Sequence, residues 1–147
     1  MADRKWAAFA SQGPTLTTEL NSLGNGSYSA PGTAIDNTTN KHTHAFADIV
    51  LASLNPTDGG VAYLDFFFLA SPDGSTYEDA PASTNPGWHV RVRGVPVDQA
   101  SSAKRVVTAK FPILPLKYKG VLLNSTGVSL GASGNTVTIY TGYETVA

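Results

Sequence analysis

The chain has 147 residues, no cysteine and a formal net charge of −1, and only 14% of its residues are charged. A chain of this length corresponds to one domain of ordinary size. The absence of cysteine excludes a disulfide scaffold and a cysteine-ligated metal site, and the near-zero charge provides no general attraction to nucleic acid. The N-terminal segment lacks the apolar stretch of a signal peptide, and no apolar run is long enough to cross a bilayer. We therefore expect a soluble protein synthesised in a cytoplasm.

Charge is distributed unevenly along the chain. Residues 1–89 contain three Lys and Arg against nine Asp and Glu, whereas residues 90–147 contain seven against two. One interpretation is that the two halves cross each other in one sandwich and neutralise each other locally. The other is that surfaces of opposite charge meet between neighbouring subunits.

The first part of the chain is predicted to contain an arm, a strand and a connection with several turns. Residues 1–14 (MADRKWAAFASQGP) combine charged and small residues with two isolated aromatic residues and end at Gly-Pro, which indicates an arm. Residues 15–23 combine helical leucine spacing with a high threonine content, and we favour a strand. Residues 24–40 are rich in Gly, Asn and Thr, which favour turns.

Two strands follow, and the second has an unusual face. Residues 41–55 alternate in polarity and place one set of side chains inward: Thr43, Ala45, Ala47, Ile49 and Leu51. Residues 61–70 place another set toward the core: Ala62, Leu64, Phe66, Phe68 and Ala70. The opposite face of this second strand is expected to meet water in a two-layer domain, yet it contains Tyr63, Phe67 and Leu69. It also contains Asp65, which we expect to pair with Arg91 or Arg93.

The rest of the chain is predicted to consist of short strands separated by turns. Pro-Asp-Gly at 72–74 marks a turn, and strands are predicted at residues 88–94, 104–111, 118–127 and 136–146. A total of about eight strands without a helix predicts an all-β, jelly-roll-like β-sandwich. The predicted domain spans residues 15–147 and follows the N-terminal arm of residues 1–14.

Neither the histidines nor the clustered carboxylates form a convincing metal site. His42, His44 and Asp48 are an incomplete set of metal ligands, so we predict no metal. The carboxylates of the DGSTYED segment, residues 73–79, lack the alternation of oxygen ligands found in a calcium-binding loop. A turn accounts for the Asp-Gly pair at its start.

Nothing in the sequence indicates catalysis or a cofactor. The chain has no Gly-x-Ser-x-Gly motif and no phosphate-binding loop. In residues 110–120, three lysines beside two aromatic residues are too few for a nucleic-acid groove. We therefore expect a protein that is not an enzyme and that binds no cofactor.

Three stretches of the chain resemble a class of small virion-associated proteins of bacteriophages. They are AIDNTTNKHTHAFADIVLASL, ASPDGSTYEDAP and RVVTAKFPILPLKYKGVLLNSTGVSLGASGNTVTIY, all within residues 34–140. The shared features are an Ile-Asp-Asn-x-Thr-Asn entry, a Ser-x-Asp-Gly-x-x-Tyr turn, a strand with spaced Lys, Leu, Asn and Gly, and a closing Ala-Ser-Gly-Asn-Thr. These are turn and core residues, so they point to a fold more than to an activity.

The resemblance implies a non-enzymatic structural protein of the virion. Such a capsid cement (decoration) protein binds the major capsid protein at subunit junctions on the capsid surface and assembles as a homo-oligomer, typically a trimer. A neighbouring subunit would then cover the second face of the strand at 61–70, which makes Tyr63, Phe67 and Leu69 candidate interface residues. Trp6 and Phe9 are further candidates because aromatic residues dominate interface energetics. The alternative for these two is folding back on their own domain.

Two other functions are left open by the sequence. A carbohydrate-binding or receptor-binding module on a similar sandwich would use Trp88, Tyr77 and Tyr28 as stacking platforms. A tail or head–tail connector component would differ in its place and copy number in the virion. Neither a nucleic acid nor a membrane is expected as a partner.

Overall fold

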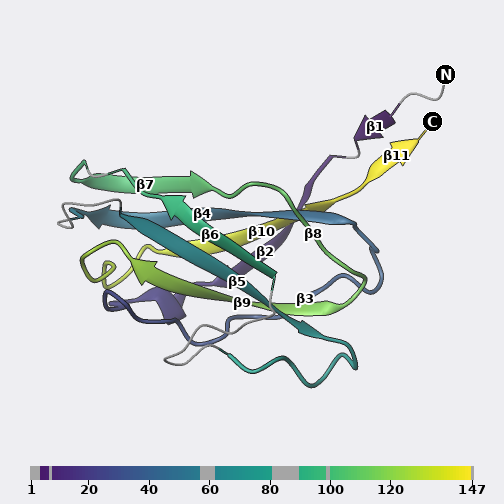
Figure 1. Ribbon diagram of the computed structural model, residues 1–147, viewed down its shortest axis with the longest axis horizontal. Coiled ribbons are helices and arrows are strands. Elements are labelled where there is room, and N and C mark those ends of the chain that lie inside the picture. Colours follow the sequence, from purple (N-terminus) through teal and green to yellow (C-terminus); the bar gives the residue numbers. More distant parts are fainter. Residues whose placement is uncertain (1–3, 7, 57–61, 81–89, 99, 147) are drawn as a thin grey trace.

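The computed structural model describes residues 4–6, 8–56, 62–80, 90–98 and 100–146. It is an all-β sandwich of two antiparallel sheets, which confirms the predicted fold class (Figure 1). The first sheet has the strand order β2-β10-β4-β7, with β8 also paired to β4. Its strands are β2 (Ala10–Leu16), β4 (His44–Leu54), β7 (Ser102–Val107), β8 (Phe111–Pro112) and β10 (Thr136–Gly142).

The second sheet has the order β3-β9-β5-β6. Its strands are β3 (Ile35–Asp36), β5 (Tyr63–Ser71), β6 (Val90–Pro96) and β9 (Lys117–Ser125). A single 3-10 turn, η1 (Thr18–Leu20), is the one helical element among the described residues. No helix in this part of the chain is both long and apolar enough to cross a membrane.

The core lies between the two sheets and is formed by the faces that alternation predicts. On β4 the side chains of Ala45, Ala47, Ile49 and Leu51 are fully buried. On β5 the facing side chains of Leu64, Phe66 and Phe68 are equally buried and belong to the same cluster. Period-two patterning therefore assigns the inward face of both central strands correctly.

The strand predicted for residues 15–23 is wrong over most of its length. β2 ends at Leu16, and the chain turns through η1, which is closed by a hydrogen bond from the Leu20 N–H to the Thr17 carbonyl (3.2 Å). The Thr17 N–H is accepted by the Glu19 carboxylate at 2.8 Å, so that side chain stabilises the turn. The turn buries Leu20 as fully as Leu16, because the chain reverses between them.

Part of the predicted arm also lies in a sheet. β2 pairs with β10 from Ala10 onward, with Thr141 opposite Ala10 and Tyr140 opposite Ser11. Residues 10–14 are thus an edge strand of the sandwich and not a free segment. This pairing explains why Gly13 and Pro14, although typical of a break, interrupt the register of β2 without ending it.

Both ends of the chain join in a separate two-stranded ribbon. β1 (Arg4–Trp6) pairs antiparallel with β11 (Glu144–Val146), with Arg4 opposite Val146 and Trp6 opposite Glu144. Figure 1 shows this ribbon at the upper right, extending beyond the body of the two sheets. The ribbon continues the neighbouring strands β2 and β10, so it projects from the first sheet.

Ion pairs join the acidic first half of the chain to the basic second half. Asp36 pairs with Lys117 at 3.7 Å, Asp48 with Arg105 at 2.8 Å, and Asp65 with Arg91. Each pair connects an acid before residue 90 to a base after it. The halves therefore neutralise each other within one sandwich, which is the first of the two interpretations drawn from the sequence.

Candidate functional site

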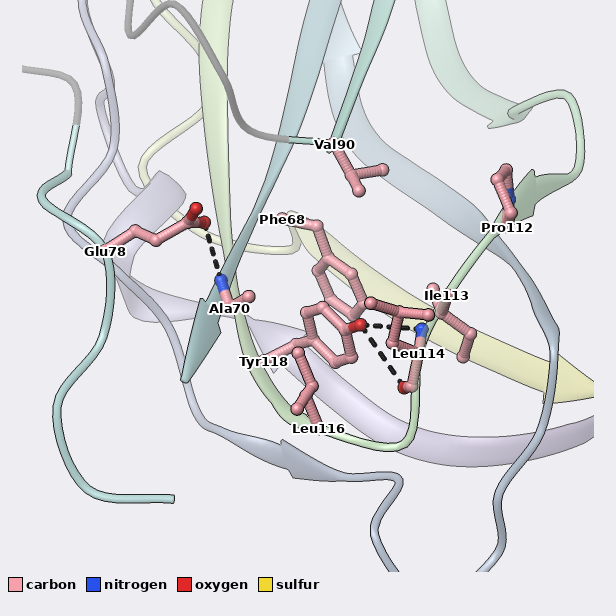
Figure 2. Close-up of a pocket in the computed structure, with 9 residues that line it drawn as sticks. All are labelled: Phe68, Ala70, Glu78, Val90, Pro112, Ile113, Leu114, Leu116 and Tyr118. Carbon is pink, nitrogen blue, oxygen red and sulfur yellow. Dashed lines mark hydrogen bonds between the residues drawn. The ribbon is translucent and has the colours of Figure 1, made fainter. Parts of the chain in front are cut away.

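A pocket of about 290 Å³ opens where β5 ends and β6 and β9 begin (Figure 2). Phe68, Val90 and Tyr118 line it from the second sheet, and the segment that follows β8 closes the opposite side. Nearly all of its lining groups are apolar: Phe68, Ala70, Val90, Pro112, Ile113, Leu114, Leu116 and the ring of Tyr118, with Glu78 as the charged exception.

Tyr118 forms one wall of the pocket and is held in place by two kinds of contact. Its ring stacks on Phe68 with centroids 4.4 Å apart and planes 1° from parallel. Its hydroxyl accepts a hydrogen bond from the Leu114 N–H (2.8 Å) and donates one to the Leu114 carbonyl (3.2 Å). Burial raises the pKa of the Tyr118 hydroxyl, so it stays neutral at physiological pH. These contacts fix the shape of the pocket. The Tyr118 hydroxyl is hydrogen-bonded to the Leu114 backbone and does not point into the pocket as a free polar group.

Glu78 marks the edge of the pocket on the side of β5. Its carboxylate accepts a hydrogen bond from the Ala70 N–H (2.8 Å), and its own N–H donates to the Ala70 carbonyl (3.0 Å). The chain after the 71–79 turn therefore runs back beside the end of β5. Glu78 lies next to Ala70, just beyond the point where β6 begins to pair with β5 at Val90 and Phe68. The described lining residues thus form an apolar pocket with the Glu78 carboxylate at its edge, and they include no nucleophile–base pair.

The sequence did not predict this pocket. The sequence predicts strands at residues 104–111 and 118–127 and no element for the residues between them. In the structure, residues 112–116 connect β8 of the first sheet to β9 of the second. Leu114 in this segment is 64% exposed. The run Pro-Ile-Leu-Pro at residues 112–115 could have indicated it. The two prolines are incompatible with a central strand, so the apolar side chains between them must pack outside a regular sheet.

The second face of β5 is covered by its own chain, which corrects the expectation of a neighbouring subunit. Phe67 and Leu69 are 0% and 1% exposed and form a small cluster with Val121. Tyr28 packs edge-on against the Phe67 ring at 5.7 Å, and the Arg91 guanidinium lies over the same ring at 4.9 Å. Tyr28 and Arg91 come from segments outside β5. Alternation along β5 therefore could not predict that they cover Phe67.

Two other predictions for this face have different outcomes. The expected pairing of Asp65 with Arg91 is confirmed by an ion pair across β5 and β6. Tyr63 lies at the start of the strand and is 37% exposed, so it is the one predicted residue of this face that meets solvent.

The two aromatic residues of the predicted arm lie near the ribbon. Phe9 is half-buried on its own domain, with its ring 5.2 Å from that of Phe46. It also covers Gly142 of β10, where an added Cβ would come within 3.1 Å of the ring. Phe9 therefore folds back on its own domain, which is the alternative that the sequence analysis gave to an interface role. Trp6 belongs to β1, and its side chain lies outside the described residues.

The residues weighed as metal ligands are occupied by other contacts. His42 Nδ1 is 2.6 Å from the Thr141 hydroxyl, and His44 Nδ1 is 3.0 Å from the Thr43 hydroxyl. Both carboxylate oxygens of Asp48 accept hydrogen bonds from Arg105, at 3.0 and 2.8 Å. Within the described ranges no three His, Asp or Glu side chains group as metal ligands.

Asp73 has the structural role that the turn motif predicts. One of its carboxylate oxygens accepts hydrogen bonds from the N–H groups of Ser75 (2.8 Å) and Thr76 (2.7 Å). These hydrogen bonds, with further ones from the Thr76 and Ser71 side chains, hold the pKa of Asp73 far below its ordinary value. The carboxylate is therefore charged at neutral pH.

The aromatic residues proposed as carbohydrate platforms are engaged in packing. The Tyr28 ring meets Phe67, and the Tyr77 ring has the Lys119 ammonium 4.6 Å from its centroid. Trp88 lies outside the described residues. The two tyrosines that the structure describes therefore do not form an exposed platform on which a sugar ring could stack.

Comparison with known proteins adds no identification. The chain matches no protein-family model and no curated protein sequence.

Proposed function

We propose that this chain is a non-enzymatic structural protein of a phage virion. It acts as a cement protein that binds at junctions of major capsid subunits and stabilises the head. Its action is mechanical, because many weak contacts on one particle add up through multivalency and oppose expansion of the shell.

The β1–β11 ribbon is the main support for this function. A two-stranded sheet on its own is marginally stable in water and needs a third strand or a packed layer. The ribbon pairs with no other described strand and extends beyond the sandwich (Figure 1). An element of this kind, built from both ends of the chain, is suited to packing against a neighbour in an assembly.

The outer face of the first sheet offers a second contact surface beside the ribbon. The rings of Phe46 and Tyr140 stack at 5.1 Å, Phe9 packs next to them, and Val107 is 54% exposed. The neighbouring charges of Asp48 and Arg105 neutralise each other. A surface that combines aromatic rings with few unpaired charges resembles the centre of a protein interface more than an ordinary solvated face.

Electron cryomicroscopy of the virion whose genome encodes this chain tests the proposal. The expected result is density for the sandwich on the outside of the head, at junctions between major capsid subunits and in three copies around each local axis. Light scattering of the purified protein is expected to show a trimer. Density in the tail, or absence of the chain from the particle, would contradict the cement function.

A further inference from the structure

We infer that the pocket between β5, β6, β9 and the 112–116 segment binds an aromatic side chain of a partner protein. This inference rests on the proposed function, since it supplies a point of attachment to the capsid. The sequence-based candidates for attachment lie elsewhere, on the arm and on the second face of β5.

The size of the pocket fits one aromatic side chain. An engineered apolar cavity of about 150 Å³ holds a benzene molecule. The pocket measures about 290 Å³, which leaves room for a ring system of indole size. This volume lies at the lower limit of sites for drug-sized ligands, which is about 300 Å³.

The chemistry of the lining also favours a ring. The stacked pair Phe68–Tyr118 presents an aromatic wall, and Figure 2 shows Val90 and Leu116 directed toward these two rings from either side. The Tyr118 hydroxyl and the Leu114 backbone satisfy each other. Recognition therefore depends on shape and ring contacts, which suits an aromatic group without a buried polar atom.

The rim of the pocket favours a ring that belongs to a protein over a free small molecule. Leu114 lines the pocket and is 64% exposed, the highest value among the large hydrophobic residues that the structure describes as exposed. A small molecule inside the pocket would leave this leucine in water. A chain that carries the aromatic ring would cover it and exclude water around the anchor.

Charge at the rim defines the residue next to the ring. Among the described residues that line the pocket, Glu78 is the charged one, and Asp79, which follows it, is exposed. A carboxylate at the edge of an apolar pocket disfavours an acidic neighbour and favours a basic one. The partner segment is therefore expected to present Trp, Tyr or Phe beside Lys or Arg.

Two model peptides test this chemistry on the full chain. N-acetyl-Trp-Lys-amide and N-acetyl-Trp-Glu-amide are titrated while amide resonances are followed by NMR. The lysine peptide is expected to shift the resonances of Ala70, Leu114 and Tyr118 and to bind more tightly than the glutamate peptide. Glu78→Gln keeps an acceptor for the Ala70 N–H, and it is expected to reduce that preference by about threefold or more.

Variants at the pocket connect peptide binding to attachment. Val90→Phe fills the pocket and is expected to weaken both peptide binding and capsid attachment at least about tenfold, the effect of losing one buried ring. Ala132→Phe adds a ring at an exposed position of the turn before β10, outside the pocket and both proposed contact surfaces, and is the control. If Val90→Phe disturbs the fold, Leu114→Ser removes the exposed apolar side chain at the pocket opening and is expected to weaken attachment.

Each outcome discriminates between the two proposals. Absence of peptide-induced shifts in the pocket would overturn the inference. Peptide binding together with wild-type attachment of both Val90→Phe and Leu114→Ser would overturn the assignment to a capsid partner. Peptide binding by a chain that is absent from the virion would contradict the cement function and leave the recognition of a basic aromatic segment in place.

Discussion

Arg91 of β6 forms an ion pair with the Asp65 carboxylate in the middle of β5, and its guanidinium also lies over the ring of Phe67, 4.9 Å from the centroid. The other oxygen of Asp65 accepts a hydrogen bond from the Gly94 N–H (2.6 Å). The side chains of Asp65 and Arg91 are only 4% and 15% exposed. A buried carboxylate in an apolar strand is thus stabilised because its partners come from the adjacent strand.

Removal of one member of this pair is expected to destabilise the sandwich strongly. Arg91→Ala leaves the Asp65 carboxylate buried and partly unpaired, at a cost of about 3–5 kcal/mol in the free energy of unfolding. Urea denaturation measures this change. Arg93→Ala, an exposed arginine on the same strand, is the matched control and is expected to change stability by about 0.5 kcal/mol or less. Equal effects of the two substitutions would contradict a specific role for Arg91.

Substitution of the two neighbouring phenylalanines of β5 tests the correction to the second face. Phe67 and Phe68 are both fully buried in the single chain. Phe67→Ala and Phe68→Ala are therefore each expected to lower stability by about 3–5 kcal/mol, measured by thermal and urea unfolding of the isolated protein. Tyr63→Ala, at the exposed start of the strand, is the control. A Phe67→Ala variant that keeps full stability and loses only its oligomeric state would restore the original interface assignment.

Alternation predicted the inward faces of β4 and β5 because it depends on local geometry. The side chain at every second position points to the same face of a strand, whatever the rest of the chain does. The cover of Phe67 depends on Tyr28 and Arg91, which reach it only once the sheet has formed. Chemistry predicted a partner for Asp65 correctly, since a buried charge requires one.

The pocket and the ribbon could not be predicted for a related reason. The pocket exists because the 112–116 segment leaves one sheet and crosses to the other. No local sequence pattern predicts how far apart the two sheets lie at this point. The ribbon pairs residues 4–6 with residues 144–146, the two extremes of the chain. Short segments without alternation carry no signal for such a long-range pairing.

The Asp73 turn is expected to make stability depend on pH in the acidic range. Hydrogen bonds from Ser75 and Thr76 lower the pKa of Asp73 in the folded state. A group whose pKa is lower when folded stabilises the protein above its unfolded pKa of about 3.9, and that contribution is lost as the pH falls toward the folded value. Asp73→Asn is therefore expected to flatten part of the fall in melting temperature below about pH 4. A wild-type acid profile for this variant would show that the turn contributes nothing.

Two truncations separate the ribbon from the sandwich. Deletion of residues 1–8 removes β1 and leaves Phe9 and β2, so the sandwich is expected to keep its wild-type stability. Deletion of residues 1–12 also removes Phe9, which packs on Phe46 and Gly142, and the part of β2 opposite Thr141 and Tyr140. This longer deletion is expected to cost about 2 kcal/mol or more, the contribution of a largely buried aromatic side chain, as measured by urea unfolding.

The shorter deletion is also the more direct test of the ribbon in assembly. Without β1, the β11 strand has no partner among the described strands. Because the sandwich itself remains intact, any loss in trimer formation or capsid attachment then belongs to the ribbon. We expect attachment to weaken at least about tenfold, equivalent to 1.4 kcal/mol per subunit, in a co-sedimentation assay with purified capsids. Wild-type attachment and trimer formation after deletion of residues 1–8 would show that the ribbon makes no contact in the assembly.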